Sequence, residues 1–157
     1  MKKVFALAFA LLLLLCNAGC GKPNQAFPVL IQSNGTRIPA YKHFLWSESF
    51  SEYGWLCADG ASLSSALPTV CQEIPAVTYS ADFQIHCSRQ VTQSSLSVYD
   101  CDFNPIHRNL GQIDFDSLSK GEYYLVVSVN VQGNYIKSQK KFESAGYECV
   151  CKLIISE

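Results

Sequence analysis

The strongest pattern in this 157-residue chain lies near its end, where apolar residues alternate with others. Residues 123–131 read YYLVVSVNV, so every second position from Tyr123 to Val131 is apolar. Successive side chains of a β-strand point to opposite faces, so this period of two predicts a long strand with one apolar face. A second strand follows a polar connection over residues 133–145, and we expect the two strands to pair as a hairpin. The inward face of that second strand would consist of Tyr147, Cys149, Cys151, Leu153 and Ile155.

Earlier segments also favour strands, and no long helical pattern occurs. Asn34-Gly35 separates two apolar segments, and this dipeptide readily takes the positive φ angles of a two-residue hairpin turn. Residues 82–88 and 95–101 alternate and lie close in sequence, so we expect them to be antiparallel neighbours. Residues 47–68 are rich in Ser, Gly and acidic residues and predict a loop with one short turn of helix. The fold class expected is all-β.

The N-terminus has the layout of a secretory signal peptide. A short cationic segment, Met1 to Lys3, precedes an unbroken apolar run over residues 4–15. Because a membrane-spanning helix needs about 20 apolar residues, this run favours export over a permanent span. We expect residues 1–19 to be the signal peptide, residues 20–26 a lipidated N-terminus and tether, and residues 27–157 the folded domain.

The expected cleavage site, Asn17-Ala18-Gly19-Cys20, resembles the lipobox of bacterial lipoproteins, with Asn17 where the family usually has Leu. In that family the cysteine thiol is acylated and becomes the first residue of the mature protein. The resemblance implies a lipid on Cys20 and a protein anchored in the cell membrane on its extracytoplasmic face. Two alternatives stay open: ordinary secretion with cleavage after Ala18, and a segment that is not cleaved.

Composition and motifs narrow the function classes. Removing residues 1–19 takes away two lysines and no acidic residue, which changes the net charge from −1 to −3. A mildly acidic domain argues against a nucleic-acid partner. No nucleophile elbow, zinc-protease, phosphate-loop or dinucleotide motif occurs, so we predict no cofactor and no enzyme. A hydrolase with a dispersed site remains an alternative, because the residues of a catalytic triad need not be neighbours in sequence.

A turn just before the long strand suggests the architecture. Leu118-Ser-Lys-Gly121-Glu-Tyr123 resembles the Leu-x-x-Gly-x-Tyr corner of immunoglobulin-like and related bacterial β-sandwich modules. There the tyrosine hydroxyl bonds back to upstream backbone. The resemblance implies an antiparallel immunoglobulin-like β-sandwich of seven or eight strands. It implies no activity, because that scaffold carries many functions.

Six cysteines follow Cys20, and an even number in an exported chain suggests disulfides. Cys57 and Cys71 lie in expected loops and are the candidate bridge. Cys87 and Cys101 have the same spacing in the sequence as Cys57 and Cys71. The hairpin expected there, however, would hold them roughly 16 Å apart in space. The Cα atoms of a disulfide are only about 4–7 Å apart.

Cys149 and Cys151 would share one face of the last strand, where two thiols could bind a soft metal ion or form a redox pair. The other interpretation, which we favour, is that both are small buried hydrophobic residues.

The sequence therefore predicts an anchored binding or structural module of the cell envelope. Its partner would be a protein or an envelope polymer, and Tyr53 and Trp55 are the candidate contact surface. Lys137, Lys140 and Lys141 could contact an anionic lipid or wall polymer, although a solvated loop is the default expectation. The rival function is thiol redox or soft-metal handling through Cys149 and Cys151.

Overall fold

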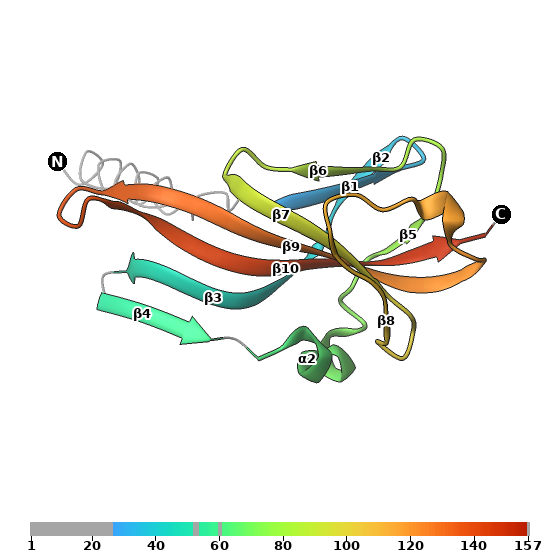
Figure 1. Ribbon diagram of the computed structural model, residues 1–157, viewed down its shortest axis with the longest axis horizontal. Helices are drawn as coiled ribbons and strands as arrows, with labels where there is room; N and C mark the ends of the chain where they lie inside the picture. Colours follow the sequence, from blue (N-terminus) through green and yellow to red (C-terminus); the bar gives the residue numbers. More distant parts are fainter. Residues whose placement is uncertain (1–26, 52–53, 60, 157) are drawn as a thin grey trace, which may run out of the picture.

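The computed structural model describes residues 27–156 except 52, 53 and 60, and over residues 48–59 the description covers the backbone. This part of the chain is mostly β-structure, which confirms the all-β class (Figure 1). It contains ten strands, more than the seven or eight expected. They are accompanied by a short α-helix, α2 (Leu63–Val70), and a 3-10 turn, η1 (Phe115–Ser117).

The strands form two sheets. The smaller has three antiparallel strands in the order β2-β1-β6. The larger has seven strands in the order β4-β3-β10-β9-β7-β8, and β5 joins it by pairing parallel with β10. The bounds are β1 (Val29–Ser33), β2 (Thr36–Pro39), β3 (Tyr41–Ser51), β4 (Gly54–Asp59), β5 (Ala76–Thr78), β6 (Gln84–Cys87), β7 (Val91–Tyr99), β8 (Pro105–Leu110), β9 (Gly121–Ile136) and β10 (Lys141–Ile155).

The predicted final hairpin is the centre of the large sheet. β9 and β10 pair antiparallel, with Val127 opposite Cys149 and Leu125 opposite Cys151. The polar connection expected over residues 133–145 was wrong, because both strands continue through most of it and only residues 137–140 form the turn. Most residues over 132–142 are exposed on both faces, so the apolar alternation that would have revealed a strand is absent.

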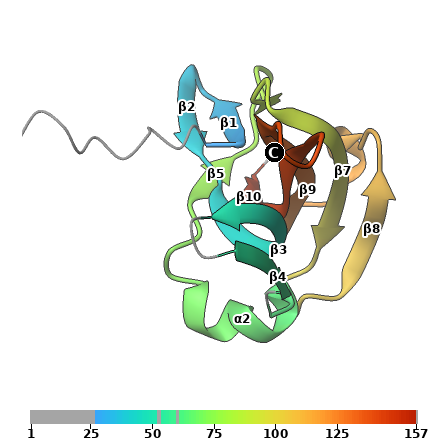
Figure 2. The ribbon, with the colours of Figure 1, turned by 90° about the vertical axis from the view of Figure 1, so that its left-hand side faces the viewer.

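The central parts of β9 and β10 are buried on both faces. One face packs against the small sheet, where Ile31, Leu125 and Cys151 are fully buried. The other face packs against α2 through Val126, Val150 and Leu63. The molecule therefore has three layers: the small sheet, the large sheet and the helix (Figure 2). Burial on both faces explains why residues 125–127 of β9 are all apolar.

The first predicted turn is confirmed. Asn34 and Gly35 have φ angles of +50° and +70° and connect β1 to β2. The Asp82 carboxylate accepts hydrogen bonds from both backbone N–H groups at 2.8 Å, and a third from Ser80 Oγ at 2.6 Å. These bonds hold the pKa of Asp82 at about 2; the largest contribution is the Ser80 hydroxyl, followed by the Gly35 N–H. The segment before β6 thus fixes the turn of the neighbouring hairpin.

Two other expectations were wrong. The segment 47–68 is not mainly loop: β3 continues to Ser51, pairs with β4, and is followed by α2. The expected antiparallel pair over 82–88 and 95–101 does not form either. β6 pairs with β1 in the small sheet, whereas β7 pairs with β8 and β9 in the large one. Alternation identifies the buried face of a strand but not its partner.

The tyrosine of the corner before β9 bonds back to upstream backbone, as expected from the sequence. Tyr123 Oη donates to the carbonyl oxygen of Ser119 at 2.8 Å. This bond ties the start of the longest strand to the backbone that precedes it.

Candidate functional site

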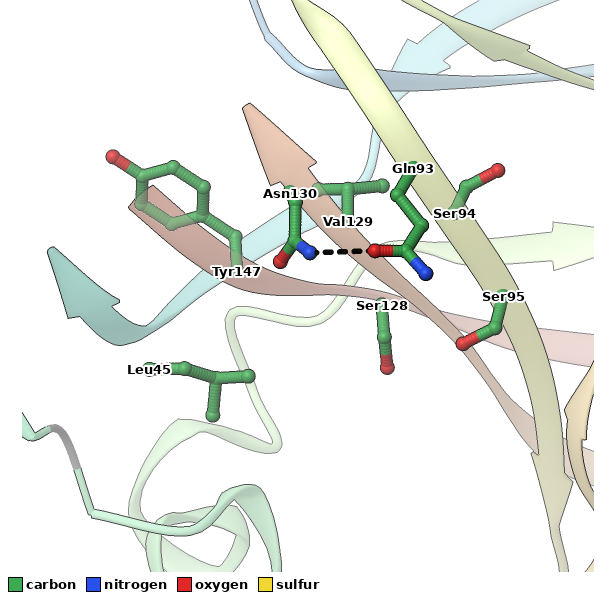
Figure 3. A pocket seen from close by; sticks show the side chains of 8 residues that line it. All are labelled: Leu45, Gln93, Ser94, Ser95, Ser128, Val129, Asn130 and Tyr147. Carbon is green, nitrogen blue, oxygen red and sulfur yellow. Dashed lines mark hydrogen bonds between the residues drawn. The ribbon is translucent and has the colours of Figure 1, made fainter. Parts of the chain in front are cut away.

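A shallow cavity of about 210 Å³ opens on the large sheet, across strands β3, β10, β9 and β7 (Figure 3). Four uncharged polar side chains, those of Gln93, Ser95, Ser128 and Asn130, share one face of the sheet. The side chains of Ser94, Val129 and Tyr147 are directed to the opposite face (Figure 3). The lining residues are Leu45, Gln93, Ser94, Ser95, Ser128, Val129, Asn130 and Tyr147.

Two β-bulges border this cavity. On β3, Leu45 is an extra residue between Phe44 and Trp46, because these face the consecutive residues Tyr147 and Gly146 of β10. On β7, Thr92 is the extra residue, because Val91 and Gln93 on either side of it pair with the consecutive residues Val131 and Asn130 of β9. Bulges bend strands and redirect side chains, and they are frequent beside functional sites. The two bulges thus account for a hollow in an otherwise continuous sheet.

The polar wall is organised around an amide pair. Asn130 Nδ2 donates to Gln93 Oε1 at 3.0 Å, a bond visible in Figure 3. Each amide has a second polar atom, so Asn130 keeps a carbonyl acceptor and Gln93 an N–H donor. The hydroxyls of Ser95 and Ser128, which are opposite each other in the register, add groups that both donate and accept.

A row of polar residues crosses the sheet beside the cavity. In register order it runs His43 on β3, Glu148 on β10, Ser128 on β9 and Ser95 on β7. Residues directly opposite on neighbouring strands share a face, so the row is continuous. His43 Nε2 donates to the carbonyl oxygen of Ala61 at 2.7 Å, which ties β3 to the segment before α2.

Glu148 is the unusual member of this row. Burial raises the pKa of its carboxyl group, and the nearby His43 and a hydrogen bond from the Leu63 backbone N–H partly oppose that shift. Leu63 is the first residue of α2, and the N-cap residue Ser62 makes no side-chain capping bond. The Glu148 carboxylate therefore caps the helix from a neighbouring strand. Its second oxygen, Oε2, is buried and has no hydrogen-bond partner among the described residues.

The order of residues in the row decides what chemistry it supplies. A serine nucleophile needs an imidazole within hydrogen-bond reach of its hydroxyl. Here Glu148 lies between His43 and Ser128, so the imidazole is two strands away from the serine. The row supplies hydrogen bonds and a helix cap, but it does not supply a nucleophile–base pair.

Cys149 and Cys151 are buried in the core between the sheets, 1 % and 0 % exposed. Burial raises the pKa of each thiol to about 12. The thiolate is the form that attacks disulfides and binds metals, so this environment disfavours both reactions. Among the described residues, no group of three or more metal-binding side chains is arranged to hold an ion. These observations favour the interpretation of both cysteines as core residues.

The remaining predicted residues are only partly within the described structure. Cys71 is exposed at the C-terminal end of α2. The side chain of its candidate partner Cys57 lies outside the described residues, so the bridge stays a prediction. The same holds for Cys20 and for the contact surface formed by Tyr53 and the Trp55 side chain. Cys87 and Cys101 are both free, and the hairpin expected to separate them does not form.

Sequence reasoning missed the cavity. Its residues come from four strands and meet only through the register of the sheet. Asn130 had one visible sign, a polar residue between two valines of the alternating run, which by itself indicates only a solvated face.

No protein-family model, curated protein or solved structure matches the chain. No helix in the described part of the chain is long and apolar enough to cross a membrane.

Proposed function

We propose that this protein is a membrane-anchored extracytoplasmic lipoprotein whose domain is a non-catalytic module that binds an uncharged saccharide of the cell envelope. The anchor is a lipid on Cys20, and the sequence around that residue supports it: a cationic start, an apolar run and the Ala18-Gly19-Cys20 core of a lipobox. Two or more acyl chains would hold the protein stably at a membrane.

The lining of the cavity is the observation that carries the binding proposal. Every polar side chain in it is neutral, and together they present both donors and acceptors. Leu45 adds apolar surface beside them. A sugar ring has hydroxyl groups around its edge and C–H groups on its faces, so it complements such a mixed wall. Pockets for drug-sized ligands are roughly 300–1,000 Å³, so a cavity of about 210 Å³ suits a single ring.

The architecture supports a scaffold role. Two sheets pack face to face over one core, and the Tyr123–Ser119 bond matches the immunoglobulin-like corner. We propose that the domain is a variant of the immunoglobulin-like sandwich, extended by the β3–β4 hairpin and α2. This scaffold presents binding residues on sheet faces and loops, and it does not by itself determine a ligand.

Calorimetric titration tests the binding proposal. The purified protein is titrated with N-acetylglucosamine, with glucose and with polysaccharide extracted from the envelope. Loss of one neutral hydrogen bond costs about 0.5–1.5 kcal/mol, so Gln93→Ala and Asn130→Ala should each weaken binding roughly two- to twelve-fold. Gln112→Ala is the matched control, because Gln112 is exposed and does not line the cavity. Absence of binding to all three probes, or equal affinity in all variants, would contradict the proposal.

A further inference from the structure

The hairpin of β9 and β10 extends beyond the rest of the large sheet. β7 pairs with β9 only as far as Val131, and β3 pairs with β10 only from Ser144 onward. Among the described strands, residues 133–143 pair only with each other, and we call this segment the arm. In Figure 1 it forms the end of the molecule opposite the C-terminus.

The arm has a defined structure at its base. The register shifts between Phe142 and Ser144, and the Glu143 carboxylate accepts a hydrogen bond from the Asn134 N–H at 3.2 Å. A Cβ atom at Gly133 would lie 2.8 Å from Glu143 Oε2, so a residue without a side chain leaves room for this carboxylate. The bulge is thus internally hydrogen-bonded and fixes the direction of the two strands beyond it.

An exposed aromatic pair lies near the end of the arm. Tyr135 and Phe142 are opposite each other in the register, with ring centroids 5.0 Å apart. They are 50 % and 45 % exposed, so each leaves about half of its surface in water. Neither ring belongs to a core cluster of the described residues. The pair therefore contributes little to the fold and is available to another surface.

Lysines surround the tip of the arm. Lys137 and Lys140 are exposed in the turn, and Lys141 begins β10. This local positive charge contrasts with the net charge of −1 for the whole chain. Tyrosine rings settle at the interface between lipid and water, and phenylalanine rings insert at the headgroup boundary. Each lysine near an anionic bilayer adds attraction. A soluble polyanion would use the lysines but would not need exposed rings, so the combination favours a bilayer.

The arm and the N-terminal end of β1 lie toward the same end of the molecule (Figure 1). β1, the first described strand, and β10 both run away from the end of the molecule where the arm lies (Figure 1). The described chain begins at Phe27, immediately before β1. The N-terminal end of β1 therefore faces the same end of the molecule as the arm.

We propose that the tip of the arm docks on the surface of an anionic phospholipid bilayer, with Tyr135 and Phe142 in the headgroup region and Lys137 and Lys140 against lipid phosphates. The inference rests on the proposed function only for the location of the protein at a membrane. The arm would hold the domain in one orientation and leave the cavity on the large sheet accessible to envelope saccharide.

Hydrogen exchange of the full-length protein, expressed in bacteria and recovered with its native processing, tests the docking. The protein is mixed with vesicles of phosphatidylcholine alone, or of phosphatidylcholine and phosphatidylglycerol in equal parts. Amides over residues 134–142 should exchange more slowly only with the anionic vesicles. Each lysine contributes roughly five-fold to association, so Lys137→Gln with Lys140→Gln should weaken docking roughly 25-fold. Arg37→Gln with Arg108→Gln removes equal charge at exposed positions outside the arm and should have no effect.

Three results would overturn the proposal: no protection with anionic vesicles, equal protection with neutral vesicles, or protection by soluble dextran sulfate that Phe142→Ser leaves unchanged. The intact mass of the same sample tests acylation of Cys20 independently of docking by the arm. An acylated Cys20 with an unprotected arm refutes docking and leaves the anchor intact. An unacylated chain whose arm is protected by added vesicles refutes the anchor and supports docking.

Discussion

Gly146 offers the sharpest test of the packing around the cavity. It is buried on β10, opposite Trp46 on β3 and Asn130 on β9. A Cβ atom built on Gly146 would lie 2.1 Å from Trp46 Nε1 and 2.7 Å from Cδ1 and Cε2 of the same ring. These separations are far below van der Waals contact, so even one methyl group would displace the indole.

We expect Gly146→Ala to destabilise the protein because the Trp46 ring must leave its position on the strand. Added methylene groups in well-packed sites cost about 1–3 kcal/mol. For a domain of this size, that corresponds to a fall in Tm of roughly 3–12 °C. Thermal unfolding followed by circular dichroism measures the fall, and tryptophan fluorescence of the folded protein reports the movement of the indole.

A double-mutant cycle with Trp46→Ala isolates the cause. Once the indole is absent, the same Gly146→Ala change has nothing to displace, so its cost should fall to within about 0.5 kcal/mol of zero. An unchanged Tm in Gly146→Ala would refute the expected clash with the Trp46 ring. A cost that is the same with and without Trp46 would also refute it, because the destabilisation would then have another origin.

Three further predictions concern the corner, the first turn and the buried thiols. Tyr123→Phe removes the bond to Ser119 and should lower the free energy of unfolding by about 0.5–1.5 kcal/mol; unchanged urea midpoints would contradict this. The pKa of Asp82 is lowered from 3.8 to about 2, so its stabilising effect is complete above pH 4 and lost as the pH falls toward 2. The Tm difference between wild type and Asp82→Ala should therefore shrink over that window, and a constant difference would refute the cause. Cys149 and Cys151 should react with a thiol reagent only after unfolding, whereas the exposed Cys101 should react in the native protein; native labelling of the buried pair would revive the redox or metal hypothesis.

The features that sequence predicted are those encoded within a short stretch. The β9 strand follows from alternation over residues 123–131, the first hairpin from Asn34-Gly35, and the corner from the spacing of Gly121 and Tyr123. Each depends on neighbouring residues alone, so long-range contacts need not be known.

The features that sequence missed depend on pairing between distant segments. Residues 82–88 have the alternation of a strand, but their partner is β1, more than fifty residues earlier in the chain. The strand β4 lies in a segment whose serines, glycines and acids suggest a loop, and its partner β3 supplies the register. The cavity is the extreme case, since two bulges and four strands create it together.

The most direct test of the proposed function is the location and mass of the protein expressed in a bacterial host, for wild type and for Cys20→Ala. We expect a membrane-bound wild type whose intact mass matches acylated residues 20–157, and a variant that lacks the acyl groups. A soluble, unlipidated wild type would contradict the anchor, and Cys20 would then count as a seventh cysteine in the exported chain.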